Sequence, residues 1–206
     1  MKQYDDDTEV AEARKIFEKK HHKATLIQNT ERYTIIDWRQ ENGSGEYYVN
    51  YIIDKKRGSL IISGDLGDCI ATWYNRNSVH NIARYINSVG YFISKFQCAS
   101  DSYDYDEDDI LEDIKEELKD SGVEHTEEFE NNWDDFTSDF GDDVYRDGLH
   151  PSHDRIEFLE DYLGPDWWES ASSWGQRINI RVFLWVAGLN MAVEQLDAAG
   201  LLNKED

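Results

Sequence analysis

RYTIIDW (32–38), EYYVNYII (46–53), SLIIS (59–63) and CIATWY (69–74) follow one another along the chain, and each gap between them contains glycine. β-branched and aromatic residues dominate these segments, which favours strands, and the gaps have hairpin length. The gap at 63–68 lacks the G-x-x-x-x-G-K pattern of a phosphate-binding loop and carries two aspartates, so it predicts a turn. Residues 32–74 therefore predict an antiparallel β-meander.

Helical patterns flank these predicted strands. Apolar residues recur at helical spacing within 8–23, and a second helix is expected at 78–88, after Ser78 as N-cap. The segment 91–97 fits either another strand or a short helix, and its pattern does not decide between them. Near residue 100 the composition changes abruptly from balanced to acidic. We therefore expect an α+β subdomain over 1–100, in which flanking helices accompany the antiparallel meander.

The remainder, 101–206, predicts an acidic helical subdomain. Apolar stripes at helical period indicate two helices, with Ile110, Leu111, Ile114 and Leu118 on the first and Phe129, Trp133, Phe136 and Phe140 on the second. A loop at 141–152, a third helix at 154–163 and an aromatic turn at 166–169 follow. The helix expected at 174–196 is the most apolar, and its broad face predicts a central position around which the acidic helices pack. The fold class expected for the whole chain is α+β.

The formal charge of the chain is concentrated in one segment. Residues 101–169 hold 27 Asp and Glu against four Lys and Arg, whereas the remaining residues hold 17 of each kind. Solubility does not require such a concentration, so it suggests a basic partner, although a merely solvated acidic face is the alternative. With a sequence pI near 4.5, direct binding to nucleic acid or to an anionic membrane is disfavoured.

Helical spacing places many carboxylates opposite the apolar stripes, where they would form ridges about 5 to 6 Å apart. Four aromatic side chains that are expected to be partly exposed, those of Tyr103, Tyr105, Tyr145 and Trp167, would add anchors that lose their water on binding. The predicted partner-binding surface consists of Asp104, Asp106, Asp109, Asp113, Glu116, Asp120, Glu127, Asp134, Asp135, Asp139, Asp142, Asp143, Tyr103 and Tyr105.

Motifs for metal binding or catalysis are weak. The aspartates from Asp104 onward fail the EF-hand pattern, because Asp109 replaces its glycine and Lys115 its final glutamate. The best metal candidates are His150 and His153, with Asp147 and Asp154 beside them, but HxxH in a proline-containing loop matches no H-E-x-x-H helix.

The two cysteines, Cys69 and Cys98, lack CxxC spacing and are expected to be reduced thiols in or near the core. No nucleophile stands in a G-x-S-x-G context. The sequence therefore predicts no enzyme, no cofactor and no metal, while a metal-dependent hydrolase using His150 and His153 stays as an alternative.

The run TIIDWRQENGSGEYYVNYIIDKKRGSLIISGDLGDCIATWYN (34–75) resembles uncharacterised proteins of phages and mobile elements of Gram-positive gut bacteria. Small acidic proteins from that setting include anti-CRISPR and other anti-defence inhibitors, several of which occupy nucleic-acid channels of nucleases. The resemblance thus favours an anti-defence inhibitor, and together with the segregated charge it predicts a non-enzymatic, DNA-mimicking inhibitor of a CRISPR effector nuclease. No functional motif matches residue by residue, so no site residue is carried over.

A different class of binding protein, an acidic immunity protein that neutralises a nuclease toxin, fits the same charge. No run of apolar residues approaches a membrane span, and the acidic N-terminus, which includes Asp5, Asp6 and Asp7, is unlike a signal peptide. The expected location is therefore the cytoplasm of a bacterial host cell.

Overall fold

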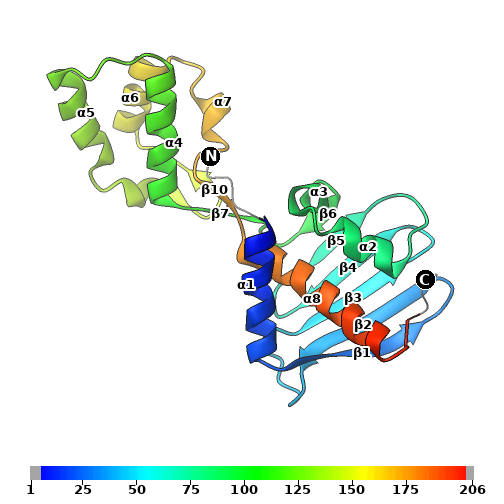
Figure 1. Ribbon diagram of the computed structural model, residues 1–206. Coiled ribbons are helices and arrows are strands. Elements are labelled where there is room, and N and C mark those ends of the chain that lie inside the picture. The colour runs from blue at the N-terminus through cyan, green and yellow to red at the C-terminus, as the bar shows by residue number, and fades with distance from the viewer. Residues whose placement is uncertain (1–5, 203–206) are drawn as a thin grey trace. The chain divides into compact units, whose positions relative to one another are not determined.

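The computed structural model describes residues 6–202 and confirms the predicted α+β fold class (Figure 1). Its contacts divide the chain into two compact units. We call residues 103–178 the acidic unit, and residues 6–102 together with 179–202 the sheet unit. The change of unit at 102–103 lies close to the boundary expected near residue 100, but the residues from 179 onward belong with the sheet.

The sheet unit is built on a six-stranded antiparallel meander in which neighbours in sequence are neighbours in the sheet. Its strands, in order, are β1 (His22–Asn29), β2 (Tyr33–Gln40), β3 (Val49–Asp54), β4 (Ser59–Gly64), β5 (Cys69–Thr72) and β6 (Phe96–Ala99). The meander predicted from residues 32–74 is therefore confirmed, and one further strand extends it at each edge.

Helices cover one face of this sheet, and α1, α2 and α8 are seen together on that side in Figure 1. They are α1 (Asp6–Lys19), α2 (Val79–Tyr85), α3 (Val89–Ile93) and α8 (Ile180–Ala198). The Tyr51 hydroxyl donates to the carbonyl oxygen of Trp185 at 2.9 Å, which ties β3 to α8. A Cβ on Gly188 would meet that hydroxyl oxygen at 2.4 Å. Glycine is therefore required in the middle of α8 for this close approach.

The expected position of the C-terminal helix is wrong. The sequence placed 174–196 at the centre of the acidic helices, whereas α8 packs against α1 and the sheet, where its core residues include Trp185 and Leu189. The reason is that the meander leaves the apolar side chains of one whole face, among them Trp38 and Tyr51, in need of cover. A helix that is apolar on nearly all sides suits that central position.

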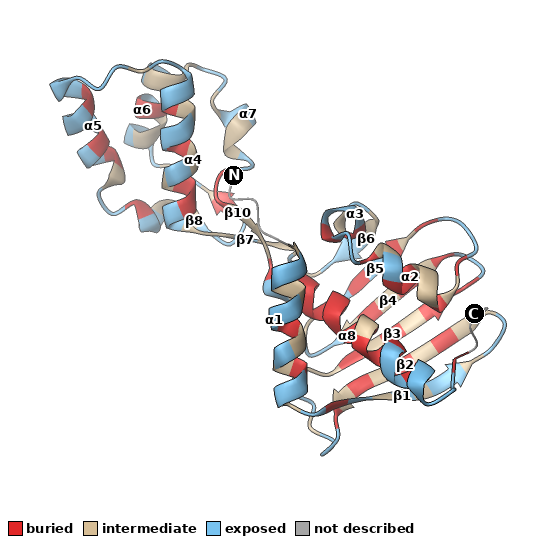
Figure 2. Ribbon diagram, in the orientation of Figure 1, coloured by how far each residue is buried: buried red, intermediate tan, exposed pale blue. Residues whose placement is uncertain are grey.

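The acidic unit has a core of its own, built on the predicted apolar stripes (Figure 2). Its main helices are α4 (Glu107–Asp120), α5 (Glu127–Thr137) and α6 (His153–Leu163), with the short α7 (Trp168–Ala171) and the 3-10 helix η1 (Phe140–Asp143). The short strands β8 (Val144–Tyr145) and β9 (Gly148–Leu149) pair within the segment predicted as a loop. Phe136 and Phe158 lie at the centre of the core, with ring centroids 4.5 Å apart.

The acidic unit is an insertion in the sheet unit. Strands β7 (Tyr103–Tyr105) and β10 (Gln176–Ile178) pair antiparallel at the point where the chain enters and leaves it. The backbone N–H of Asn179 donates to the carbonyl oxygen of Ser102 at 2.9 Å. The two residues of the sheet unit that flank the insertion are therefore neighbours. No helix within residues 6–202 combines the length and the apolar character needed to cross a bilayer.

Candidate acidic binding surface

One side of α4 that was expected to face outward is turned into the acidic unit. Asp109 is only 9% exposed, and Arg177 donates to its carboxylate. Asp106, the N-cap of α4, forms a second ion pair with Arg177 at 3.0 Å. Asp113 accepts the backbone N–H of Gly175 at 2.8 Å. The expected exposed ridge at 106, 109 and 113 is not found as such: Asp109 is buried, Asp106 and Asp113 are only partly exposed, and their carboxylates bind Gly175, just before β10, and Arg177, within it.

The segment opposite this side of α4 explains why acids are needed there. Gly175 has φ +62°, and a Cβ at this position would meet the Ile110 side chain at 2.3 Å. The next residue back, Trp174, donates its indole N–H to Glu117 at 2.8 Å. Because the backbone lies this close to the helix, three donors need hydrogen-bond acceptors there: the Gly175 N–H, the Trp174 indole and the Arg177 guanidinium. Carboxylates of α4 accept from all three.

A different row of carboxylates on α4 remains exposed. Its members follow one another at intervals of four residues and are Asp108, Glu112, Glu116 and Asp120. At 1.5 Å of rise per residue, each carboxylate is about 6 Å of helix axis from the next. Only Glu116 and Asp120 were in the predicted surface. Asp108 and Glu112 were missed, although their spacing from Glu116 was visible in the sequence.

The acids predicted on α5 and after it divide in the same way. Glu127, Asp134, Asp135, Asp139 and Asp142 are exposed, as is Asp104 in β7. Asp143 is different, because its side chain is 15% exposed and Arg155 donates to it at 2.7 Å. The backbone N–H of Ser152 donates to the same carboxylate at 2.7 Å. Burial alone would raise the pKa of Asp143, but these donors outweigh it and hold the pKa below its ordinary value.

Arg155 connects three parts of the acidic unit. Besides Asp143, its guanidinium donates to the carbonyl oxygens of Phe136, at 2.8 Å, and of Ser138. The same group lies over the Phe140 ring, 5.3 Å from its centroid. It thereby joins α6 to the end of α5 and to η1. Asp143 and Arg155 are thus parts of the scaffold rather than of the exposed surface.

A hollow of about 620 Å³ lies between α5 and α6. Phe136, Phe158 and Tyr162 contribute aromatic surface to it. Four carboxylates also line it, those of Asp135, Asp154, Glu157 and Asp161, and all four residues are exposed. Aromatic surface beside carboxylates suits a lysine or arginine side chain. The acids of α6 were missed, although their spacing of three and four residues within the predicted helix was a usable signal.

The predicted aromatic anchors differ in exposure. Tyr103 and Tyr105 are half-buried, and Tyr105 packs against the core of the acidic unit. Trp167 is partly buried and stacks on Trp174 with ring centroids 6.0 Å apart. Tyr145 is 55% exposed. Trp168, not singled out from the sequence, is exposed to a similar degree, so Tyr145 and Trp168 are the better anchors.

The histidines and cysteines considered as metal ligands or thiols, His150, His153, Cys69 and Cys98, do not form a common site. His150 pairs with Asp147 at 3.0 Å, whereas His153 lies 3.5 Å from Glu157. Within residues 6–202, no three His, Cys, Asp or Glu side chains are grouped as metal ligands. Cys69 and Cys98 are free thiols, the first buried and the second exposed rather than near the core. Burial raises the pKa of Cys69 to about 12.

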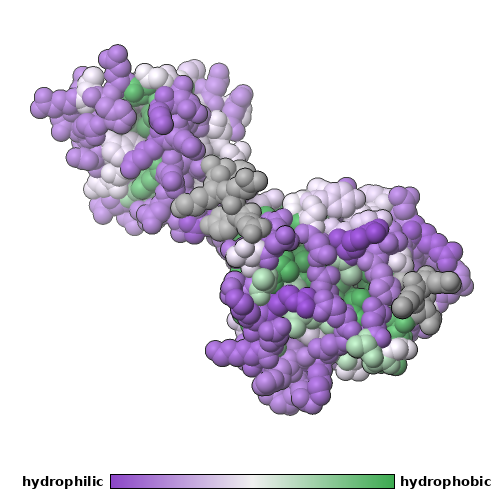
Figure 3. All heavy atoms as spheres, viewed as in Figure 1, coloured by the Kyte–Doolittle hydropathy of each residue, from purple (hydrophilic) through white to green (hydrophobic). Residues whose placement is uncertain are grey.

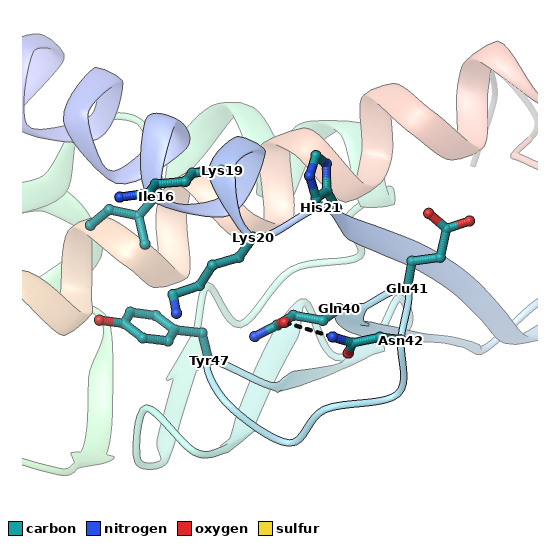
Figure 4. A pocket seen from close by; sticks show the side chains of 8 residues that line it. All are labelled: Ile16, Lys19, Lys20, His21, Gln40, Glu41, Asn42 and Tyr47. Carbon is teal, nitrogen blue, oxygen red and sulfur yellow. Dashed lines mark hydrogen bonds between the residues drawn. The ribbon is translucent and has the colours of Figure 1, made fainter.

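A second hollow, of about 700 Å³, lies in the sheet unit between the end of α1 and the turn after β2 (Figure 4). Lys20 points to the Tyr47 ring, 4.7 Å from its centroid, and pairs with Glu46 at 2.7 Å. His21 and Tyr47 both line the hollow in the left-handed backbone region, with φ of 52° and 58°. The charged residues among those that line it are Lys19, Lys20 and Glu41.

The acidic unit therefore displays carboxylates on the outer sides of α4, α5 and α6. Hydrophilic residues cover most of its visible face in Figure 3. Residues 103–178 contain 26 acidic and five basic residues, and two of those five, Arg155 and Arg177, are committed to internal ion pairs. Comparisons with protein-family models, with curated proteins and with solved structures found no match to this chain.

Proposed function

We propose that the chain is a non-enzymatic inhibitor that binds the basic nucleic-acid groove of another protein through the exposed carboxylates of the acidic unit. A CRISPR effector nuclease is the first candidate for that partner. The proposal requires no catalytic step and no cofactor. The observation that carries it is the confinement of the excess charge to one folded unit, in which an aromatic core holds the helices that display it.

The spacing of the charges supports competition with nucleic acid. The exposed row on α4 presents a carboxylate about every 6 Å of axis, compared with a phosphate about every 3.4 Å along one DNA strand. The acidic helices are thus a sparser version of a phosphate backbone. They gain from the same electrostatic attraction to lysine and arginine, and the attraction speeds association with a basic groove.

The hollow between α5 and α6 supports a specific contact in addition to this general attraction. A cationic side chain that enters it would meet carboxylates beside aromatic side chains, of which Tyr162 is the most exposed. Elsewhere in the acidic unit, Lys115 of α4 lies over the Trp133 ring of α5, 5.2 Å from its centroid. The aromatic surface of the unit therefore accepts an ammonium group.

The test is a charge reversal at Asp120, Asp134 and Asp135. All three are exposed and lie in the last turns of α4 and α5. A lysine there interacts favourably with the negative end of the helix dipole, so we expect the variant to fold. If each change removes about 1 kcal/mol of binding, the triple variant raises Kd about 100-fold. The measurement is co-purification with candidate effectors, followed by a binding titration at two salt concentrations.

The matched control reverses three exposed acids of the sheet unit, Glu12, Glu18 and Glu31, which changes the total charge by the same amount. We expect Kd to change less than about threefold in this control and wild-type binding to weaken steeply with salt. Equal effects of the two triple variants would show that only net charge matters and would contradict the proposed surface. Capture of a nuclease toxin in place of a CRISPR effector would favour the immunity protein.

A further inference from the structure

The face of the meander opposite the helices carries a row of isoleucines. Strand pairing places Ile35 opposite Ile52, Ile52 opposite Ile61, and Ile61 opposite Ile70, on β2, β3, β4 and β5. Side chains of directly paired residues point to the same face of a sheet, so the four form one continuous stripe across the strands. Ile70 is 37% exposed, and the other three are partly exposed.

The helices of the sheet unit leave this face open. Trp38 and Tyr51, which alternate with the row on β2 and β3, are completely buried under α1 and α8. Figure 2 shows the resulting alternation of buried and intermediate residues along the strands. A contiguous apolar stripe that lies in the middle of a sheet face is typical of an interface. We call the face that carries it the isoleucine face.

The polar residues beside the stripe carry no unpaired charge. Asp37, in the next row of the same face, pairs with Arg39 at 2.8 Å. On the other side, Asp54 pairs with Arg32 at 2.9 Å, and the hydroxyls of Ser59 and Thr72 lie 3.2 Å apart. These charges beside the stripe are therefore already paired within the chain. The surface that fits the isoleucine face is another apolar surface whose flanking polar groups are already hydrogen-bonded or paired.

We infer that the isoleucine face is a self-association surface, on which a second copy of this chain packs its own isoleucine face. Outside residues 103–178 the chain has 18 acidic and 16 basic residues, so the two sheet units approach without strong repulsion, and salt screens the repulsion between the two acidic units. The two sheets would stack about 10 Å apart, as the sheets of a β-sandwich do. With a twofold axis between the copies, the stripe of each copy contacts the stripe of the other.

The size of the face is sufficient for such a dimer. Strands about 4.8 Å apart and about six residues long give a sheet face of roughly 25 by 20 Å, or about 500 Å² per copy. If the whole face is covered, two copies would bury about 1,000 Å², which reaches the lower limit for a specific interface. The dimer is accordingly expected to be of micromolar strength rather than permanent. This inference is independent of the proposed inhibitor function.

Sedimentation equilibrium of the full chain from about 1 to 200 μM tests the inference, because this range brackets a micromolar Kd. We expect a monomer–dimer equilibrium that is unchanged or stronger when salt rises, since burial of apolar surface drives it. A chain that stays monomeric over this range would overturn the inference and leave the isoleucine face to a different protein. So would dimers that dissociate on adding salt.

Two variants locate the interface. Ile61→Lys places a charge in the middle of the stripe, and Ile70→Lys places one at its more exposed end, where folding tolerates it. Each should weaken dimerisation at least tenfold, with the thermal unfolding curve confirming that the variant is folded. The control is Leu201→Lys, because Leu201 is 51% exposed and lies beyond α8. Dimerisation of Ile70→Lys at wild-type strength would exclude this face as the interface.

Discussion

Carboxylates in the acidic unit have two distinct roles that the sequence alone does not separate. Asp109 and Asp143 are enclosed and hold arginines, whereas Asp120 and Asp134 are exposed. A buried carboxylate is destabilising unless it is paired and hydrogen-bonded, and each enclosed acid here has such a partner. The display of charge therefore depends on a smaller set of acids that hold the scaffold together.

Replacement of Asp143 by asparagine tests this scaffold role. At pH 7 we expect Asp143→Asn to lower the free energy of unfolding by about 2 to 3 kcal/mol, because Arg155 loses its carboxylate. The pKa of Asp143 is below its ordinary value in the folded chain, so its stabilising effect is present above the unfolded pKa of about 3.9. That effect is lost as the pH falls through the lower, folded pKa.

The difference between wild type and Asp143→Asn should therefore be full near pH 7 and should shrink below about pH 4. Denaturant unfolding at several pH values measures it. The control is Asp142→Asn at an exposed neighbour, for which we expect a change within about 0.5 kcal/mol at every pH. A difference that stayed constant down to pH 2 would contradict the assigned titration.

At the scale of elements, α4 combines a buried stripe with like charges at four-residue intervals. Ile110, Ile114 and Leu118 are buried in the core, while Asp108 and Asp120 are exposed at opposite ends of the helix. Each like-charged pair four residues apart is destabilising by about 0.2 to 0.5 kcal/mol. The helix therefore depends on core packing, and its charge pattern is not optimised for stability.

Neutralising the two end aspartates should have unequal effects. Asp120→Asn removes a negative charge from the negative end of the helix dipole and also relieves repulsion from Glu116, so we expect a gain of about 0.5 to 1 kcal/mol. Asp108→Asn relieves similar repulsion but loses a favourable charge in the first turn, so its net effect should be close to zero. Thermal unfolding at low salt measures both, and a larger gain from Asp108→Asn would refute this account of the helix.

Periodicity predicted the elements well where one face of an element is apolar and the other polar. The stripes of α4 and α5 are examples, whereas strands β2 to β5 were predicted from their β-branched and aromatic residues and from the length of the gaps between them. Strand β1 was missed, and residues 22 and 23 were assigned to the preceding helix. The left-handed backbone of His21 ends that helix early, and β1 is an edge strand whose sequence HKATLIQN has few of the β-branched and aromatic residues that marked its neighbours.

Features that depend on contacts far apart in the sequence were not predictable. The period of α8 indicated a buried helix but not which side chains would bury it, because both units offer apolar surface. The inward turn of Asp106 and Asp109 depends on Arg177, and that of Asp113 depends on Gly175, both some 60 to 70 positions later in the chain. Helical spacing alone placed these acids on an outer arc, and only the fold reveals their partners.

At the scale of the whole molecule, the insertion of the acidic unit predicts that the sheet unit folds without it. Ser102 and Asn179 are hydrogen-bonded neighbours, so a short glycine–serine linker can replace residues 103–178. We expect the shortened chain to unfold cooperatively and to retain its strand content, as measured by circular dichroism. A chain without a cooperative transition would show that the sheet unit depends on the acidic unit for its stability.

The late position of α8 in the chain affects folding during synthesis. Strands β1 to β6 are complete at Ala99, but the helix that covers Trp38 and Tyr51 ends at Ala198. At about 5 to 20 residues per second, the ribosome needs on the order of 10 s to make the intervening residues. During that time α1, α2 and α3 are already made, but the part of the apolar face that α8 covers stays exposed while the acidic segment is synthesised. Repulsion between such segments on neighbouring nascent chains then opposes their aggregation before α8 arrives.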